Sequence, residues 1–181
     1  MEVFMKLEKG CIHIYCGDGK GKTTASLGLA LRASGNGLKV LIVQFLKGQP
    51  TGELTTLALI PNISVIRIPQ SEKFTFQMTN EELSQLKETQ TKALLSAFSQ
   101  VTAYDYDMLI LDECLGALST NTLDYEILKQ QVLNKPEHLE LVLTGRNPDE
   151  WLLSIADYVS EIQAVKHPYE KGVSARKGIE M

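Results

Sequence analysis

The stretch G-D-G-K-G-K-T-T at residues 17–24 decides the fold, because a short apolar run precedes it and a helix-like segment follows it. The run Ile12 to Cys16 has the length and composition of a buried strand, and Thr23 to Ala33 has helical spacing that stops at the glycines of Ser34 to Gly37. In this context the backbone N–H groups of a glycine-rich loop converge on phosphate oxygens, and the start of the helix favours negative charge. The pattern predicts a loop that holds the triphosphate of a magnesium nucleotide, with ATP as the expected ligand.

The polar side chains of this loop have separate expected roles. Lys22 is a point charge for the phosphates, and the Thr23 hydroxyl can ligate magnesium. The usual spacing G-x-x-x-x-G-K-T would place its first glycine at position 16, where this chain has Cys16, so the cradle is expected to differ in detail from that of a common ATPase. A glycine-rich turn without a ligand is the alternative. The residues expected to bind ATP are Gly17, Asp18, Gly19, Lys20, Gly21, Lys22, Thr23 and Thr24.

Apolar runs like the first one recur along the chain and alternate with helical patterns. Their Ile, Val and Leu content is typical of strands buried on both faces, and the alternation indicates an α/β fold with a mostly parallel sheet of about six strands. The chain has 181 residues, which suits one core, so one domain is expected to span residues 1–181. The expected strands are Ile12 to Cys16, Val40 to Leu46, Ile63 to Ile68, Met108 to Leu111, Leu139 to Thr144 and Tyr158 to Val165.

Two further helices have recognisable start signals. Thr79 followed by Glu82 is a capping-box pattern, and the apolar face behind it continues to Val101. Asn147 is expected to cap another helix, with Pro148 at the first helical position.

Composition and charge restrict the function and the compartment. The net charge of −4 leaves no basic surplus for a phosphate backbone, so nucleic acid is not expected as a main partner. The three cysteines form no C-x-x-C pair, which fits free thiols in a reducing compartment, and the scattered histidines do not suggest a zinc site. The N-terminus has charges where a signal peptide needs an apolar core, and no stretch approaches about 18 uncharged apolar residues. A cytoplasmic protein with no membrane partner is therefore expected.

The second functional motif is the run Met108 to Leu111, which ends in the acidic pair Asp112 and Glu113. This is the Walker B arrangement, in which the first acid holds magnesium and the second polarises the attacking water in hydrolytic relatives. An acid pair that only caps the next helix would have the same sequence. The residues expected at the metal site are Thr23, Asp112 and Glu113.

Weaker signals follow other strands, at the sheet edge where ligands bind in such folds. Arg146 lies after the fifth strand and could act as a cation over the phosphates, or it could be a surface arginine after a tight turn. Lys47 to Glu53 and Pro69 to Met78 are expected to be loops at this edge. The second loop contains Phe74 and Phe76, which could cover a large flat apolar ligand or could be packed lids.

Taken together, these motifs resemble those of the CobA/BtuR-type corrinoid adenosyltransferases, over about Gly10 to Glu180. The most specific of them is the C-terminal string, which no general ATPase requirement explains. The matching motifs are G-D-G-K-G-K-T-T at 17–24, V-Q-F-L-K-G at 43–48, F-T-F at 74–76, L-D-E at 111–113, L-T-G-R at 143–146 and K-H-P-Y-E-K-G-V-S-A-R-K-G-I-E at 166–180.

The resemblance implies a three-layer RecA-like P-loop NTPase fold, a homodimer, and transfer of the 5′-deoxyadenosyl group of ATP to the cobalt(I) of a corrinoid with release of tripolyphosphate. Cob(I)alamin and cob(I)yrinic acid a,c-diamide are the implied corrinoids, and a cobalt-reducing flavoprotein is an implied partner. Cobalt(I) is itself the nucleophile, so the protein needs no activated side chain; it needs to position the ribose and stabilise the leaving triphosphate.

The same resemblance assigns residues to this reaction. The side chains of Phe74 and Phe76 match loop aromatics that shield the lower face of the corrinoid and make cobalt(II) easier to reduce. The residues expected to act in catalysis are Lys22, Glu113 and Arg146, together with Mg²⁺.

Two other functions use part of the same pattern. A small-molecule kinase or ATPase would use Lys22 and Asp112 but would cleave between phosphates. A nucleotide-dependent switch module would bind ATP without turnover. The switch module gives no reason for the aromatic loop or for the C-terminal string.

Overall fold

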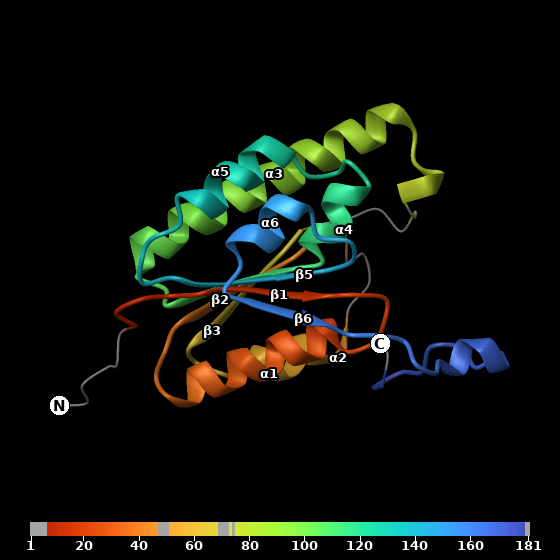
Figure 1. The fold of residues 1–181 in the computed structure, drawn as a ribbon, viewed down its shortest axis with the longest axis horizontal. Helices are drawn as coiled ribbons and strands as arrows, with labels where there is room; N and C mark the ends of the chain where they lie inside the picture. Colours follow the sequence, from red (N-terminus) through yellow and green to blue (C-terminus); the bar gives the residue numbers. More distant parts are fainter. Residues whose placement is uncertain (1–6, 47–50, 69–72, 74, 180–181) are drawn as a thin grey trace.

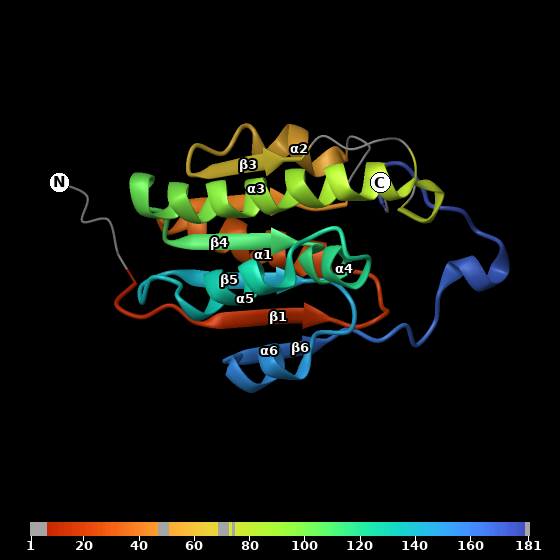
Figure 2. The same cartoon turned by 90° about the horizontal axis from the view of Figure 1, so that it is seen from above.

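The computed structural model describes residues 7–46, 51–68, 73 and 75–179. Its centre is a six-stranded parallel sheet with the strand order β3-β2-β4-β5-β1-β6. Helices α1 and α2 cover one face of this sheet and α3 to α6 cover the other, as Figures 1 and 2 show. The strands are β1 (Ile12–Cys16), β2 (Val40–Gln44), β3 (Ile63–Arg67), β4 (Met108–Asp112), β5 (Glu140–Thr144) and β6 (Tyr158–Glu161). The helices are α1 (Lys22–Gly35), α2 (Gly52–Leu57), α3 (Asn80–Tyr104), α4 (Cys114–Ser119), α5 (Tyr125–Leu133) and α6 (Glu150–Ile155).

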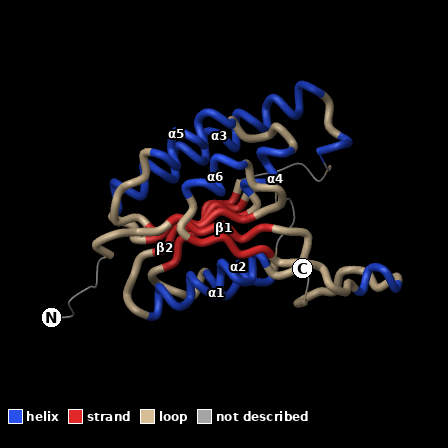
Figure 3. Tube along the Cα trace, viewed as in Figure 1, coloured by secondary structure: helices blue, strands red, loops and turns tan. Residues whose placement is uncertain are grey.

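The apolar strands explain why both faces are covered. In β2 the side chains of Leu41 and Val43 enter the core under α3, whereas Val40 and Ile42 enter the core over α1. All four are fully buried. The tube in Figure 3 shows the resulting three layers of helix, sheet and helix. The prediction of a three-layer α/β sheet with a RecA-like P-loop fold is confirmed.

The last predicted strand was wrong in its burial and its end. All residues of β6 are exposed, and the strand stops at Glu161 instead of continuing to Val165. β6 is the edge strand next to β1, so an apolar residue such as Val159 is not enclosed by the two helical layers. The apolar run predicts a buried strand because the sequence pattern alone does not distinguish an edge position from a central one.

The helix starts were predicted unevenly. The Thr79 and Glu82 capping box is present, and α3 buries Leu94 and Val101. The other predicted start was wrong, because Asn147 has a left-handed backbone (φ 50°) and α6 begins at Glu150 with Asp149 at the N-cap.

Sequence analysis assigned no residue bounds to the short helices α2, α4 and α5, although a helix after the Asp112 and Glu113 pair was one interpretation of that pair. Part of the predicted loop at 47–53 is in fact the start of α2; its residues 47–50 lie outside the described residues. In the other predicted loop, Thr75–Gln77 forms a 3₁₀ turn, whereas 69–72 and 74 lie outside the described residues. No helix in the described part of the chain combines the length and apolar character needed to cross a membrane.

Candidate active site

The loop at residues 17–24 joins β1 to α1 and contains two glycines with left-handed backbones. Gly21 has φ 114° at the N-cap of α1, and a Cβ built on it meets no atom within 4 Å. Its environment is open to a ligand, which fits a loop whose backbone approaches phosphate oxygens. Gly17 has φ 100°, and the region around it is crowded.

The crowding comes from the chain that continues β6. The Gly19 N–H donates to the Ile162 carbonyl oxygen at 2.7 Å, and Cβ atoms built on Gly17 and Gly19 would lie 2.4 and 2.7 Å from that oxygen. The Asp18 Oδ1 atom accepts a hydrogen bond from the Ala164 N–H at 3.1 Å. The first half of the loop is therefore held by the C-terminal segment, and the structure places the Asp18 carboxylate against this backbone.

Replacing Gly17 with alanine is expected to destabilise the fold by roughly 2–3 kcal/mol, because a Cβ is strained at this φ and overlaps the Ile162 carbonyl. Chemical denaturation of the two proteins measures this difference. Gly28→Ala is the control: its Cβ would meet nothing within 4 Å in the interior of α1, so it should stabilise the protein slightly. Equal stability of Gly17→Ala and the parent protein would contradict the packing assigned to the loop.

The reactive part of the loop faces the end of β4. The Thr23 hydroxyl donates to Asp112 Oδ1 at 2.9 Å, and the Thr144 hydroxyl donates to the same oxygen at 2.8 Å. Lys22 Nζ donates to the Gly19 carbonyl oxygen at 2.7 Å. Asp112 is fully buried. The structure thus brings Lys22, Thr23 and Asp112 together at the carboxyl edge of the sheet.

Glu113 has an unusual backbone for a residue that is not glycine. Its φ is 61°, and its N–H donates to Thr144 Oγ1 at 2.8 Å. Although Glu113 occupies the N-cap of α4, its side chain makes no capping hydrogen bond. A Cβ built on Gly116 would lie 2.7 Å from Glu113 Oε1, so the carboxylate lies over the first turn of α4. Glu113 is therefore the N-cap residue of α4 by its backbone position, but its side chain does not cap the helix.

Residues 19–24 of the phosphate loop and Glu113 line a cleft with a volume of about 810 Å³, a size suited to a small-molecule ligand. α1 contributes residues from successive turns, and the start of α2 and the end of the C-terminal segment line the remainder. The lining residues are Gly19, Lys20, Gly21, Lys22, Thr23, Thr24, Leu27, Gly28, Leu31, Thr51, Gly52, Glu53, Glu113, His167, Gly178 and Ile179.

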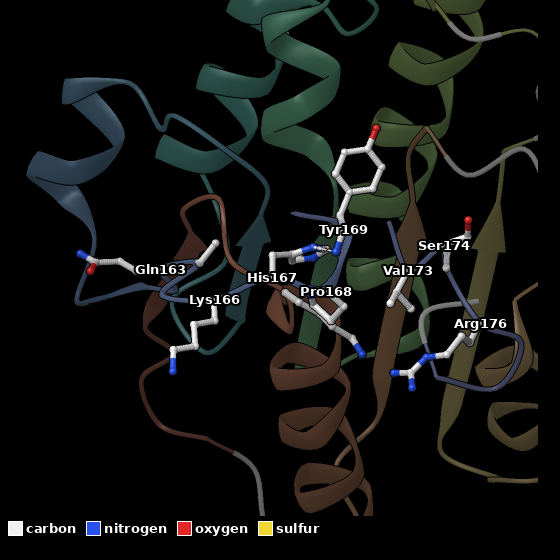
Figure 4. Close-up of a pocket in the computed structure, with 11 residues that line it drawn as sticks. Gln163, Lys166, His167, Pro168, Tyr169, Val173, Ser174 and Arg176 are labelled. Atoms are coloured by element: carbon white, nitrogen blue, oxygen red, sulfur yellow. Dashed lines mark hydrogen bonds between the residues drawn. The ribbon is translucent and has the colours of Figure 1, made fainter. Parts of the chain in front are cut away.

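A smaller cavity of about 370 Å³ shares lining residues with this cleft. Apart from Lys20, its lining comes from two stretches of the C-terminal segment, within residues 163–169 and 173–176. Figure 4 shows Lys166 on the first of these stretches and Arg176 on the second. The His167 ring also lies here, and its Nδ1 accepts a hydrogen bond from the Tyr169 N–H at 3.2 Å. Lys20 and His167 line both cavities. The segment with the most specific sequence string therefore borders the candidate nucleotide site.

The other predicted residues are not in this cleft. Arg146 is exposed after Gly145 and lines neither cavity, so its role over the phosphates stays a prediction. Phe76 lies in the Thr75–Gln77 turn and is 81% exposed. Phe74 lies outside the described residues.

Sequence reasoning missed several polar residues around the cleft. Glu53 and Thr51 line it, and fully buried Gln44 lies beside Asp112 in the strand register. Thr144 hydrogen-bonds both members of the acid pair. A polar residue at the carboxyl end of an apolar strand was the available signal for Gln44 and Thr144.

The oxygen atoms at this site suit Mg²⁺, which binds proteins through one or two carboxylates and keeps several water ligands. Thr23 and Asp112 already share a hydrogen bond, and Glu113 follows directly. Among the described residues no group of three or more His, Cys, Asp or Glu side chains forms a complete protein cage. The oxygen atoms of Thr23, Asp112 and Glu113 therefore suit a metal ion that is also bound by the phosphates of a nucleotide.

The cysteines near the site are not activated. Burial raises the pKa of the Cys114 thiol far above its ordinary value. Burial, and then the charge of Glu161, raise the pKa of Cys16. A raised pKa keeps a thiol protonated and weakly nucleophilic. Neither thiol is suited to attack a substrate.

Comparison with known proteins decides the family. The model of the ATP:corrinoid adenosyltransferases BtuR/CobO/CobP matches residues 8–181. The chain belongs to this family. A corrinoid adenosyltransferase of Escherichia coli K12 is 34% identical over 179 residues, which cover 96% of this chain and 86% of the relative. CobA of Salmonella typhimurium is 34% identical over 178 residues, with the same coverage of both chains. The corrinoid adenosyltransferase of Pseudomonas aeruginosa is 31% identical over 175 residues, covering 96% of this chain and 84% of its own.

Proposed function

We propose that this chain is an ATP:corrinoid adenosyltransferase, which transfers the 5′-deoxyadenosyl group of ATP to the cobalt(I) of a corrinoid. The observation that carries the proposal is that the P-loop and the Walker B strand meet in a member of this family. The Thr23 hydroxyl, next to Lys22 in the chain, donates to Asp112 Oδ1 at 2.9 Å. In the reaction the cobalt(I) electron pair forms a bond to the ribose 5′ carbon. The bond from that carbon to the triphosphate oxygen breaks, and tripolyphosphate leaves.

The residues of the site suit this chemistry because they act on the leaving group. Lys22 and the loop N–H groups would bind the triphosphate, whose leaving oxygen gains negative charge as the bond breaks; that these residues line the cleft supports this role. Thr23, Asp112 and Glu113 would hold Mg²⁺, which supplies further charge stabilisation when bound. The protonated thiols of Cys16 and Cys114 agree with a reaction whose nucleophile is the cobalt.

An ordinary kinase or ATPase could use the same loop, so the products of ATP separate the functions. We expect anaerobic incubation with ATP, Mg²⁺ and chemically reduced cobalamin to give a cobalt–carbon bond, seen by absorbance, and tripolyphosphate. ADP would indicate a kinase, and ADP with orthophosphate an ATPase. Intact ATP with every reduced corrinoid tested would indicate a switch module.

Several finer features belong to the same proposal. The implied corrinoids are cob(I)alamin and cob(I)yrinic acid a,c-diamide, and a cobalt-reducing flavoprotein would supply electrons. A cytoplasmic location is supported by the free cysteines Cys11, Cys16 and Cys114, which suit a reducing compartment. A homodimer is proposed from the resemblance to the family.

Replacing Phe76 with alanine is expected to slow adenosylation from the cobalt(II) state by roughly 10-fold, an effect equivalent to about 1.4 kcal/mol. Phe76 is 81% exposed, so its removal should leave the melting temperature and the ATP affinity nearly unchanged. Leu59→Ala is a matched control, because Leu59 is 79% exposed and does not line the cleft. A Phe76→Ala protein with the parental rate from cobalt(II) would show that this ring does not shield the corrinoid. We expect Phe74→Ala to have the same phenotype.

A further inference from the structure

A second set of polar side chains lies at the carboxyl edge of the sheet, beside the acid that the Walker B motif supplies. Gln44, the last residue of β2, is the register partner of Asp112 on β4. Registered residues on neighbouring strands are about 4.8 Å apart and point to the same face. Both side chains therefore lie on the α1 face, directly beyond the core residues Ile42 and Ile110.

The carboxamide of Gln44 is only partly paired. The side chain is fully buried, and Nε2 donates to Glu53 Oε1 at 3.5 Å. Oε1 has no hydrogen-bond partner among the described residues. Exchanging the amide nitrogen and oxygen would turn the oxygen toward the Glu53 carboxylate, which is an unfavourable contact. The Gln44 oxygen is thus an acceptor that needs a donor.

Two more polar groups border the candidate nucleotide cleft. Glu53 and Thr51 both line it, as the Lys22 loop does. The Thr51 hydroxyl is buried and makes no capping bond to α2, and it has no hydrogen-bond partner among the described residues. The Glu53 carboxylate contacts the Gln44 carboxamide, Gln44 is the strand neighbour of Asp112, and the Thr51 hydroxyl belongs to the same cleft as Glu53. All three groups can accept hydrogen bonds.

We propose that Gln44 and Glu53 are positioning residues for the water ligands of the nucleotide-bound magnesium ion. This inference rests on the proposed function, because it requires a metal nucleotide in the cleft. Magnesium keeps several waters when it binds to carboxylates and phosphates, and each metal-bound water donates two hydrogen bonds. Gln44 Oε1 and the Glu53 carboxylate supply acceptors beside Asp112. Partners of this kind affect metal affinity by about 10- to 100-fold in other metal sites.

The test measures Mn²⁺ binding, by electron paramagnetic resonance, to the whole protein saturated with ATP and without corrinoid. Gln44→Met keeps the side-chain length and removes the amide, and Glu53→Gln keeps the shape and removes the charge. The matched control is Gln90→Met, because Gln90 is also fully buried with one amide atom, Nε2, that lacks a partner among the described residues, but it lies on α3.

We expect Gln44→Met and Glu53→Gln each to weaken Mn²⁺ binding by about 10-fold or more, while ATP binding in EDTA stays within about 2-fold of the parent. Gln90→Met should leave both affinities unchanged. Parental Mn²⁺ affinity in Glu53→Gln would overturn the proposal, as would parental affinity in a folded Gln44→Met protein. Should Gln44→Met not fold, Glu53→Gln decides alone, because Glu53 is on the cleft wall and only partly buried.

The result of the Mn²⁺-binding test can be told apart from the result of the adenosylation test. Mn²⁺ binding needs no corrinoid, so a protein that fails to adenosylate any corrinoid can still show the metal effect. A protein that forms adenosylcorrinoid with parental Mn²⁺ affinity in both variants would keep its function and exclude this role for Gln44 and Glu53.

Discussion

Lys22→Ala is expected to lower the affinity for Mg²⁺-ATP by at least about 100-fold and to abolish productive turnover. The ammonium is the point charge of the loop, and charge-assisted bonds to a triphosphate in a partly enclosed site are among the stronger polar interactions. In the structure Lys22 Nζ contacts the Gly19 carbonyl oxygen, so its removal costs little folding energy. Isothermal titration calorimetry measures the affinity, and circular dichroism measures the fold.

Lys92→Ala is the matched control for the loss of one positive charge. Lys92 is an exposed residue of α3 that pairs with Glu88, so its removal should leave ATP binding unchanged. A Lys22→Ala protein that binds Mg²⁺-ATP within about 3-fold of the parent, which is less than 1 kcal/mol, would show that the loop does not hold the triphosphate.

Asp112→Asn is expected to lower the adenosylation rate by about 100- to 1,000-fold at saturating ATP. The asparagine oxygen can still accept from Thr23 and Thr144, so the local packing is preserved while the negative charge is lost. The loss should be only partly recovered by added Mg²⁺. Single-turnover rates at increasing Mg²⁺ concentration measure the effect.

The control for Asp112→Asn is on the same strand segment. Asp107 precedes β4 at the opposite edge of the sheet, is buried, and accepts the Lys39 N–H at 2.8 Å. Asp107→Asn should lower stability by about 1 kcal/mol without changing the rate of the folded protein. Equal rate losses in the two variants would mean that Asp112 acts only through stability.

The strands and the phosphate loop could be predicted because their signals are local. The apolar run of β2 has the composition of a strand buried on both faces, and the loop glycines follow β1 directly. The order of the strands and the exposure of β6 depend on contacts between distant segments. The apolar residues around Val159 would have the same sequence pattern in an edge strand as in a central strand, so the pattern did not reveal that Val159 is exposed.

The same distinction applies to the site. Lys22, Thr23 and Asp112 belong to spaced motifs, and the structure brings them together as expected. Gln44 lies in the V-Q-F-L-K-G string but was assigned no role, and Glu53 belongs to no motif, because their contact joins the end of a strand to the first turn of a short helix. The crowding of Gly17 against Ile162 likewise requires two segments that are far apart in the sequence.

The glycines of the loop illustrate two physical requirements in one motif. Gly21 is needed because its φ of 114° favours glycine, and the space around it is open to a ligand. Gly17 is needed because the chain after β6 lies against it. The phosphate loop is therefore part of the same packed unit as the C-terminal segment, whose residues His167 and Ile179 line the cleft. We expect changes in that segment to affect ATP binding.

Adenosyl transfer is measured directly by following ATP labelled in its adenosine part, in single turnovers with excess cob(I)alamin under anaerobic conditions. We expect the label to appear in the corrinoid, bound through a cobalt–carbon bond, with one tripolyphosphate released per adenosyl group transferred. Label recovered in ADP or in free adenosine nucleotides, with no alkylated corrinoid from cob(I)alamin or cob(I)yrinic acid a,c-diamide, would contradict this expectation.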